Sequence, residues 1–420
     1  MSEKEILRIN DNLTVILDKA QHFKSTTFNL YIMEQLGANA TKFALLPLVL
    51  KHGSKNMPTL REIESRLDNM YGAQFNIDVF KKGNIQIADY NLSVLNDKYA
   101  DGSSLIEDSL KFLSEILFNP LIVDNKFKQK YVEIDKDNLK KMIEARINDK
   151  RIYAVERCIE LMCKDDPYGI YPLGKLEDMD SVDENNLAEY YNDLIGRTKM
   201  VIVVTGNYNP EEIVREIKDI IKTNSQSQDN YSTGALIPKI DKPKKYHETM
   251  DVMQGKLSIG YTDSVDPSSD EYFSLLLMNC ILGGGPQSKL FANVREKESL
   301  AYYASSRLDK FKGILEIYCG IEVENYESAL KIIDKQIDDI KEGKISDHEI
   351  EASKAELEYA YKSISDSPDR RANFYLSQLL TGDSYNLENY INKISDLNVD
   401  DVVNAAKKLS KHTIYFMENK

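Results

Sequence analysis

The stretch that decides the fold is residues 282–303, which read Leu-Gly-Gly-Gly-Pro-Gln-Ser-Lys-Leu-Phe-Ala-Asn-Val-Arg-Glu-Lys-Glu-Ser-Leu-Ala-Tyr-Tyr. This pattern predicts a helix end, a hinge formed by Gly283, Gly284 and Gly285, and a second helix that begins at Pro286. Glycine allows positive φ and a close approach of two backbones. Proline suits the first helical position because its missing N–H would have no partner there. The chain should therefore turn sharply here and continue as a new helix.

The second helix carries Arg295, and Tyr302 follows just past the expected helix end. A guanidinium and a phenol brought together there can grip a peptide carbonyl. On local physics alone, a merely structural connection is favoured over a ligand site. A phosphate loop is excluded, because the Gly-Lys pair of that motif would have to stand where the chain has Ser288 and Lys289. No strand followed by Gly-x-Gly-x-x-Gly supports a dinucleotide site either.

Bulk properties limit the possible classes of protein. A chain of 420 residues is too long for one ordinary core, and 42% hydrophobic residues suffice for two or three domains. The net charge of −14 argues against nucleic acid and anionic membranes as partners. The N-terminus lacks the apolar core of a signal peptide, and no run of 18 apolar residues occurs. We therefore expect a cytoplasmic protein without a membrane partner.

Cysteine and histidine spacing gives no local metal motif. The four cysteines form no Cys-x-x-Cys pair, so buried free thiols are expected. The five histidines stand at least 30 residues apart, so no two of them can be ligands on one helical turn. A site assembled from distant residues stays open.

The order of elements repeats along the chain, which predicts two copies of one α+β unit. We divide the chain into an N-terminal domain at 1–224, a polar linker at 225–249 and a C-terminal domain at 250–420. Within the first domain, Pro47 should kink or shorten the buried helix 40–50. A change of apolar phase in strand 84–94 predicts a bulge near Asp89, and one helical region is expected over 124–164.

The repeat, together with Leu282-Gly-Gly-Gly-x-x-Ser-Lys-Leu-Phe-x-x-Val-Arg-Glu-Lys-x-x-Leu-Ala-Tyr302, resembles the insulinase/pitrilysin family of zinc peptidases, which includes the mitochondrial processing peptidase. The resemblance implies an α+β fold of two homologous domains. Each would be a mixed, mainly antiparallel β-sheet covered by helices, and the two would form half of a clamshell that encloses peptides. The family's substrate-gripping arginine and tyrosine fall on Arg295 and Tyr302.

The chain departs from the family at the zinc site. Catalytic members carry His-x-x-Glu-His before the glycine that ends the first domain's helix. Here those places hold Ala44, Pro47 and Leu48, and the third ligand, a glutamate, falls around Lys141 and Met142. We therefore expect no metal ligand and no catalytic residue in this chain.

These observations lead to a first hypothesis with alternatives. The chain would be the non-catalytic, substrate-binding subunit of a heterodimeric, bacterial-type metallopeptidase, with Arg295 and Tyr302 on the peptide and zinc on a homologous partner subunit. It would be inactive alone and essential to an active pair. The alternative is a catalytically inert peptide-binding or structural scaffold of the same fold. An unrelated serine or carboxylate hydrolase is a third possibility, opposed by the lack of a Gly-x-Ser-x-Gly elbow.

Overall fold

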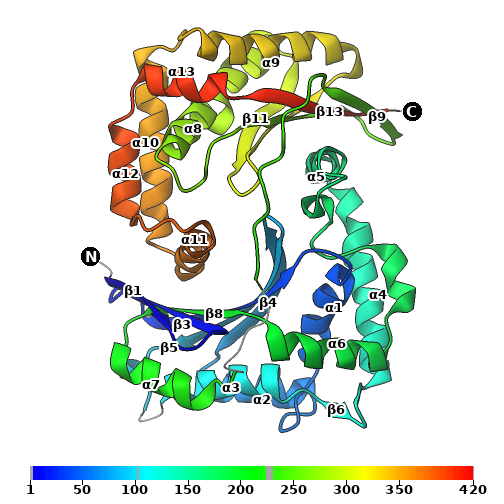
Figure 1. Ribbon diagram of the computed structural model, residues 1–420, viewed down its shortest axis with the longest axis vertical. Helices are drawn as coiled ribbons and strands as arrows, with labels where there is room; N and C mark the ends of the chain where they lie inside the picture. Colours follow the sequence, from blue (N-terminus) through cyan, green and yellow to red (C-terminus); the bar gives the residue numbers. More distant parts are fainter. Residues whose placement is uncertain (1–2, 102–103, 224–229, 420) are drawn as a thin grey trace. The chain divides into compact units, whose positions relative to one another are not determined.

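The computed structural model describes residues 3–101, 104–223 and 230–419, and the chain folds into two compact units. The first unit comprises Met1–Glu144, Ile170–Ser232 and Ser367–Ser377, and the second comprises Ala145–Gly169, Thr233–Asp366 and Gln378–Lys420. Each unit contains one mixed, mainly antiparallel sheet covered by helices (Figure 1). The predicted fold class is therefore confirmed.

The first unit is built on a six-stranded sheet with the order β1-β2-β8-β3-β5-β4. Only β2 and β8 run parallel, and the other neighbours are antiparallel. The strands are β1 (Glu3–Arg8), β2 (Leu13–Lys19), β3 (Ser25–Gln35), β4 (Gln74–Lys82), β5 (Ile85–Leu95) and β8 (Met200–Gly206).

No bulge interrupts β5, because Asp89 pairs with Tyr31 and with Asp78 in unbroken register. The prediction of a bulge there is wrong. The apolar phase changes because the first half of β5 is buried on both faces.

Helices cover one face of this sheet, and their side chains merge with Phe28, Leu30 and Ile32 of β3 into one hydrophobic core. The helices of the unit are α1 (Ala40–Leu50), α2 (Leu60–Asn69), α3 (Leu105–Phe118), α4 (Gln129–Ala145), α6 (Glu184–Arg197) and α7 (Pro210–Ile220). Pro47 does not shorten α1 as expected. Nearly the whole of α1 is buried, and this packing offsets the hydrogen bond that proline cannot make.

The expected helical region 124–164 is divided. A small hairpin of β6 (Ile122–Val123) and β7 (Lys126–Phe127) comes first, with positive φ at both turn residues, Asp124 and Asn125. After α4, a short 3-10 turn (Arg146–Asn148) leads to α5 (Lys150–Met162), whose N-terminus is capped by Asp149. The break separates two helices that belong to different units.

The second unit is built on a five-stranded sheet with the order β11-β12-β10-β13-β9. Its strands are β9 (Lys244–Met250), β10 (Gly255–Thr262), β11 (Ala301–Asp309), β12 (Ile314–Ile321) and β13 (Ser410–Asn419). Only β9 and β13 run parallel. The predicted linker 225–249 therefore ends in an edge strand, and residues 224–229 lie outside the described part of the chain.

One face of the second sheet carries the hydrophobic core of this unit, with Leu257, Ile317 and Phe416 among its members. The remaining helices are α8 (Glu271–Asn279), α9 (Tyr326–Lys341), α10 (Asp347–Ile364), α11 (Pro368–Thr381), α12 (Leu387–Ser395) and α13 (Val399–Lys407). In the described residues, no helix is both long enough and apolar enough to cross a bilayer.

Each unit is completed by a helix from the other half of the sequence. Helix α5 covers the second face of the C-terminal sheet, where Cys158 lies against the Ser258 carbonyl. Most of α11 belongs to the first unit, where Arg371 forms an ion pair with Asp18 on β2 and Asp369 accepts a hydrogen bond from Asn91 on β5. The second face of each sheet is thus covered by a segment distant in sequence, through polar contacts in the first unit and mainly apolar ones in the second.

The Arg371–Asp18 pair holds α11 on its sheet. Both side chains are buried, Arg371 Nε lies 2.6 Å from Asp18 Oδ2, and the Tyr375 hydroxyl donates to the same carboxylate at 3.1 Å. A buried carboxylate that loses its cation is strongly destabilising.

Arg371→Ala should therefore lower the free energy of unfolding by about 3–5 kcal/mol, because it leaves the Asp18 charge without its partner. Denaturant unfolding followed by circular dichroism measures the change. Asn373→Ala, at an exposed position of the same helix, is the matched control and should unfold like the wild type. Equal unfolding midpoints for both variants would show that the pair does not anchor α11.

Asp89 provides a second test of this face. Its oxygens accept from Asn29 Nδ2 at 3.2 and 3.0 Å, yet burial raises the pKa of Asp89 to about 7, with further contributions from Asp369 and Asp78. The unfolded chain has a pKa near 3.9 at this residue. The folded chain therefore holds the proton more tightly, and the stability that this gives is present below about pH 4 and lost as the pH rises through about 7.

Asp89→Asn should flatten the fall in melting temperature between about pH 4 and pH 8, since an amide does not titrate. Thermal melts across this range measure the effect. Asp68→Asn, at an exposed position on α2, is the control and should keep the wild-type pH profile. A profile of Asp89→Asn that runs parallel to the wild type would contradict the raised pKa.

Candidate functional site

Two of the hinge glycines, Gly283 and Gly285, allow close approach of neighbouring groups, and none of the three has a positive φ. Gly283 has φ −154° and ψ 18°, which ends the π-helix Cys280–Gly284, and Gly285 is extended. A Cβ at Gly283 would lie 2.5 Å from the backbone nitrogen of Ser306, and one at Gly285 would lie 2.7 Å from a carboxylate oxygen of Glu356. A side chain at Gly283 would push the backbone of β11 away, whereas one at Gly285 would require the Glu356 side chain to move.

The second helix starts later than expected. Pro286 lies in a turn, and the helix begins at Lys289. The Ser288 hydroxyl accepts from the Phe291 N–H at 3.4 Å and so acts at the helix start. From Phe291 to Lys297 the helix has π-type turns (η6), a local widening that is frequent at functional sites.

Arg295 lies exposed on η6 and has no carboxylate partner in the described part of the chain. Its guanidinium carbon lies 4.5 Å from the centre of the Phe291 ring. Stacking on an aromatic face uses the plane of the guanidinium and leaves its N–H edges available. The simple alternative, in which Arg295 pairs with a carboxylate of its own helix surface, is not what the structure shows.

Tyr302 lies at a β-bulge in the edge strand β11. Ala301 pairs with Ile321 and Tyr303 with Gly320, so Tyr302 has no partner in the ladder. A bulge of this kind redirects a side chain, and Tyr302 is 56% exposed. Its hydroxyl donates to Glu322 Oε1 at 2.7 Å, and this bond raises the pKa of the Tyr302 phenol.

The structure brings Arg295 and Tyr302 onto neighbouring elements of the second unit. The Leu300 N–H donates to the Val294 carbonyl at 3.0 Å and ties the end of η6 to the start of β11. No hydrogen bond joins Arg295 to Tyr302 in the described residues. The two side chains are thus separate contact points at one end of the second sheet.

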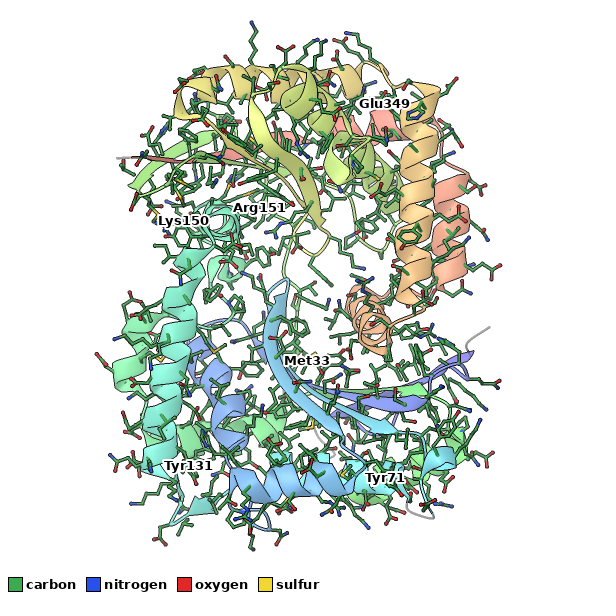
Figure 2. All side chains as sticks on the ribbon, turned by 180° about the vertical axis from the view of Figure 1, so that it is seen from behind. Met33, Tyr71, Tyr131, Lys150, Arg151 and Glu349 are labelled. Atoms are coloured by element: carbon green, nitrogen blue, oxygen red, sulfur yellow. The ribbon has the colours of Figure 1, made fainter. Side chains whose placement is uncertain are left out.

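Aromatic residues next to this end are held by cations. Arg151, labelled on α5 in Figure 2, places its guanidinium carbon 4.5 Å from the Tyr303 ring centre and 5.3 Å from that of Tyr318. The Lys256 ammonium lies 5.6 Å from the Tyr303 ring centre. These contacts fix the strand residue that follows Tyr302.

The positions of the family's zinc ligands do not fit a metal. Ala44 and Pro47 are buried in α1 and Leu48 is half-buried, and none of these side chains has a lone pair to offer. Lys141 and Met142 are exposed on α4. In the ranges that the structure describes, no group of three or more His, Cys, Asp or Glu side chains is arranged to hold a metal ion.

The end of α1 is instead tied to α4 by a polar contact. His52 Nε2 lies 2.9 Å from Asp135 Oδ2, and the His52 ring stacks on Tyr131 with their centres 4.5 Å apart. Tyr131 is labelled on α4 in Figure 2. His52 therefore links the end of α1 to α4.

The sequence alone gave no site role to Glu322 or Phe291, although Glu322 had a usable signal. Residues 301–321 form an antiparallel hairpin, and counting back from its Asp309–Ile314 pair places Ile321 opposite Tyr302, so Glu322 had to lie near Tyr302. The bulge in β11 then shifts the partner of Ile321 to Ala301. No strand was expected at β11, and Phe291 carried no signal of this kind.

Comparisons with known proteins agree with this geometry. The family model described as the peptidase M16 inactive domain matches residues 181–357. A probable inactive metalloprotease of Bacillus subtilis is 33% identical over 416 residues, covering 99% of this chain and 97% of that protein. An uncharacterized zinc protease of the same bacterium is 26% identical over 249 residues, covering 57% of this chain and 58% of the relative.

Solved structures show the same fold over the whole length. A conserved protein from Enterococcus faecalis superposes with a TM-score of 0.93 at 28% identity and covers 99% of both chains. A protease from Helicobacter pylori reaches 0.81 at 17% identity and covers 100% of both. The resemblance inferred from residues 282–303 is thereby confirmed: this chain belongs to the M16 peptidase family, as one of its inactive homologues without the zinc motif.

Proposed function

We propose that this chain is the non-catalytic, substrate-binding subunit of a cytoplasmic, heterodimeric metallopeptidase. One observation carries the proposal: Arg295 is exposed, is stacked on Phe291, and has no carboxylate partner among the described residues. An arginine in this state contributes little to folding. It is oriented to bind an incoming acceptor.

A peptide backbone supplies such acceptors. The guanidinium presents five N–H donors in a planar fork, which can bind one carbonyl oxygen or two neighbouring ones. Stacking on Phe291 removes part of the rotamer freedom of Arg295 before the peptide arrives, so less entropy is lost on binding. Arg295 is therefore assigned to peptide carbonyls.

Tyr302 takes a different part in the same site. Its phenol already donates its proton to Glu322. A peptide would therefore meet the Tyr302 ring and the Glu322 carboxylate rather than a free hydroxyl donor. The family resemblance implies that the Tyr302 hydroxyl binds the substrate directly. In this proposal the hydroxyl instead orients Glu322.

The partner is proposed to be a homologous subunit that carries zinc. This chain has no donor at Ala44, Pro47 or Leu48, so any metal chemistry requires a second protein. Bacillus subtilis holds both a probable inactive metalloprotease and an uncharacterized zinc protease related to this chain, which supports a division into two kinds of subunit. A displacement of the peptide by about 1 Å costs roughly a hundredfold in rate, so a subunit that only positions the substrate has a large effect.

Arg295→Ala should lower kcat/KM of the reconstituted pair roughly five- to hundredfold, because it removes hydrogen bonds worth about 1–3 kcal/mol. The assay mixes this chain with a candidate partner that carries His-x-x-Glu-His and follows cleavage of a fluorogenic peptide. Lys297→Ala removes another exposed cation of the same helix and should leave kcat/KM unchanged.

Thermal melts of the isolated variants accompany the kinetics, and Arg295→Ala should melt like the wild type. Unchanged cleavage by the Arg295→Ala pair would support the alternative, in which the chain is a scaffold of the same fold. A lower melting temperature with an equal loss for Lys297→Ala would assign both residues to folding or general charge.

The purified chain alone should contain no stoichiometric zinc and should not cleave peptides, since Ala44, Pro47 and Leu48 offer no lone pair to a metal. Elemental analysis and a peptide assay with and without chelator measure both properties. One tightly held zinc per chain, or cleavage that persists in a preparation free of the partner, would overturn this part of the proposal.

A further inference from the structure

The Tyr302 phenol is hydrogen-bonded to Glu322. Tyr302 donates its only proton to Glu322 Oε1 at 2.7 Å, so the phenol orients this carboxylate. On the neighbouring strand, Lys256 Nζ donates to Gln254 Oε1 at 3.5 Å, on either side of Gly255, which pairs with Ile321.

Glu322 keeps acceptor capacity beyond its bond to Tyr302. A carboxylate has two oxygens with about four acceptor positions, and the described residues fill one of them, at Oε1, through Tyr302. No lysine or arginine of the described chain lies within ion-pair distance of Glu322. A half-buried carboxylate in this state is suited to a donor that arrives from outside.

The strand register places the neighbours of Glu322. Ile321, the residue before it, pairs with Ala301 of β11 and with Gly255 of β10. Tyr302, Glu322 and the loop that precedes Gly255 therefore leave the sheet at the same end. That loop carries Met253, which is 96% exposed, and Val323 next to Glu322 is also exposed. Apolar side chains beside a carboxylate match a long side chain with an aliphatic stem and a cationic head.

We propose that Glu322 is a specificity-determining residue that binds a lysine or arginine side chain of the peptide, with Met253 and Val323 along its methylene groups. The proposal rests on the peptide-binding function above and adds the class of side chain that the site selects. Arg295 binds the peptide backbone whatever the peptide sequence, whereas Glu322 binds only a positively charged side chain of the peptide. Tyr302 is a positioning residue, because its phenol donates to the Glu322 carboxylate and holds it in place.

The test uses the isolated full chain and fluorescence anisotropy, so it needs no partner subunit. The probes are fluorescein-labelled, amidated peptides of alanine, leucine and serine that are identical except for central positions carrying lysine, glutamine or glutamate. Wild type should bind the lysine peptide about tenfold or more tightly than the glutamine peptide, as expected for a charge-assisted hydrogen bond. The glutamate peptide should bind least.

Glu322→Gln should abolish this preference and leave the affinity for the glutamine peptide unchanged. The amide oxygen still accepts from Tyr302, so the variant should fold and melt like the wild type. Glu324→Gln, two residues further along and exposed, is the matched control for the change in net charge and should keep the preference. Arg295→Ala should weaken all the peptides by the same factor.

The outcomes separate this inference from the proposed function. If the wild type binds lysine and glutamine peptides equally, or if Glu322→Gln keeps the preference, the specificity role is overturned while peptide binding stands. If Glu324→Gln abolishes the preference as fully as Glu322→Gln does, general charge explains it and the role of Glu322 is overturned. If no peptide of any class binds, the proposed function fails as well.

Discussion

A buried carboxylate must keep its cation, and this constraint joins the two halves of the sequence. Asp18 lies on the second strand of the chain, and its partner Arg371 lies on a helix more than three hundred residues later. Neither side chain reaches water, so the N-terminal sheet is complete only when α11 has docked on its polar face. The C-terminal sheet depends in the same way on α5, which arrives from the N-terminal half. Because each unit includes a helix from the other half of the sequence, neither half forms all the contacts of one unit by itself. The repeated order of elements thus describes how the chain is organised, whereas the packing crosses the boundary between the repeats.

Much of the secondary structure and the fold class could be predicted because periodicity and turn residues act locally. The helix 40–50 and the strand 200–205 appear almost as expected, with α1 at Ala40–Leu50 and β8 at Met200–Gly206. The exchange of α5 and α11 could not be predicted, since an amphipathic helix reveals that it has an apolar face but not which sheet that face will cover. The same limit explains the single helical region expected over 124–164, whose break at Arg146–Asn148 is set by tertiary packing.

Arg295 and Tyr302 were named as candidate site residues from a motif, and both side chains are exposed in the second unit. Their role in binding substrate stays a prediction. The motif could not show that the Tyr302 phenol would be occupied by Glu322, because that contact depends on a bulge at the start of β11 and on hairpin register. Likewise, the three glycines indicated a sharp connection. Their physical reason, the closeness of Ser306 and Glu356, involves elements that lie well beyond the hinge in sequence.

The residues at the family's zinc-ligand positions and those at its substrate-binding positions differ in burial. In α1, apolar side chains stand at the family's ligand positions, and Ala44 and Pro47 are packed into the core. At the end of the second sheet Tyr302 stays exposed, as do Arg295 on the preceding helix and Met253 in the loop before β10. An exposed methionine, a cation without a partner and a carboxylate with free acceptor capacity are neutral or mildly costly for a chain that only needs to fold. These groups therefore support the peptide-binding role that we propose for the second unit.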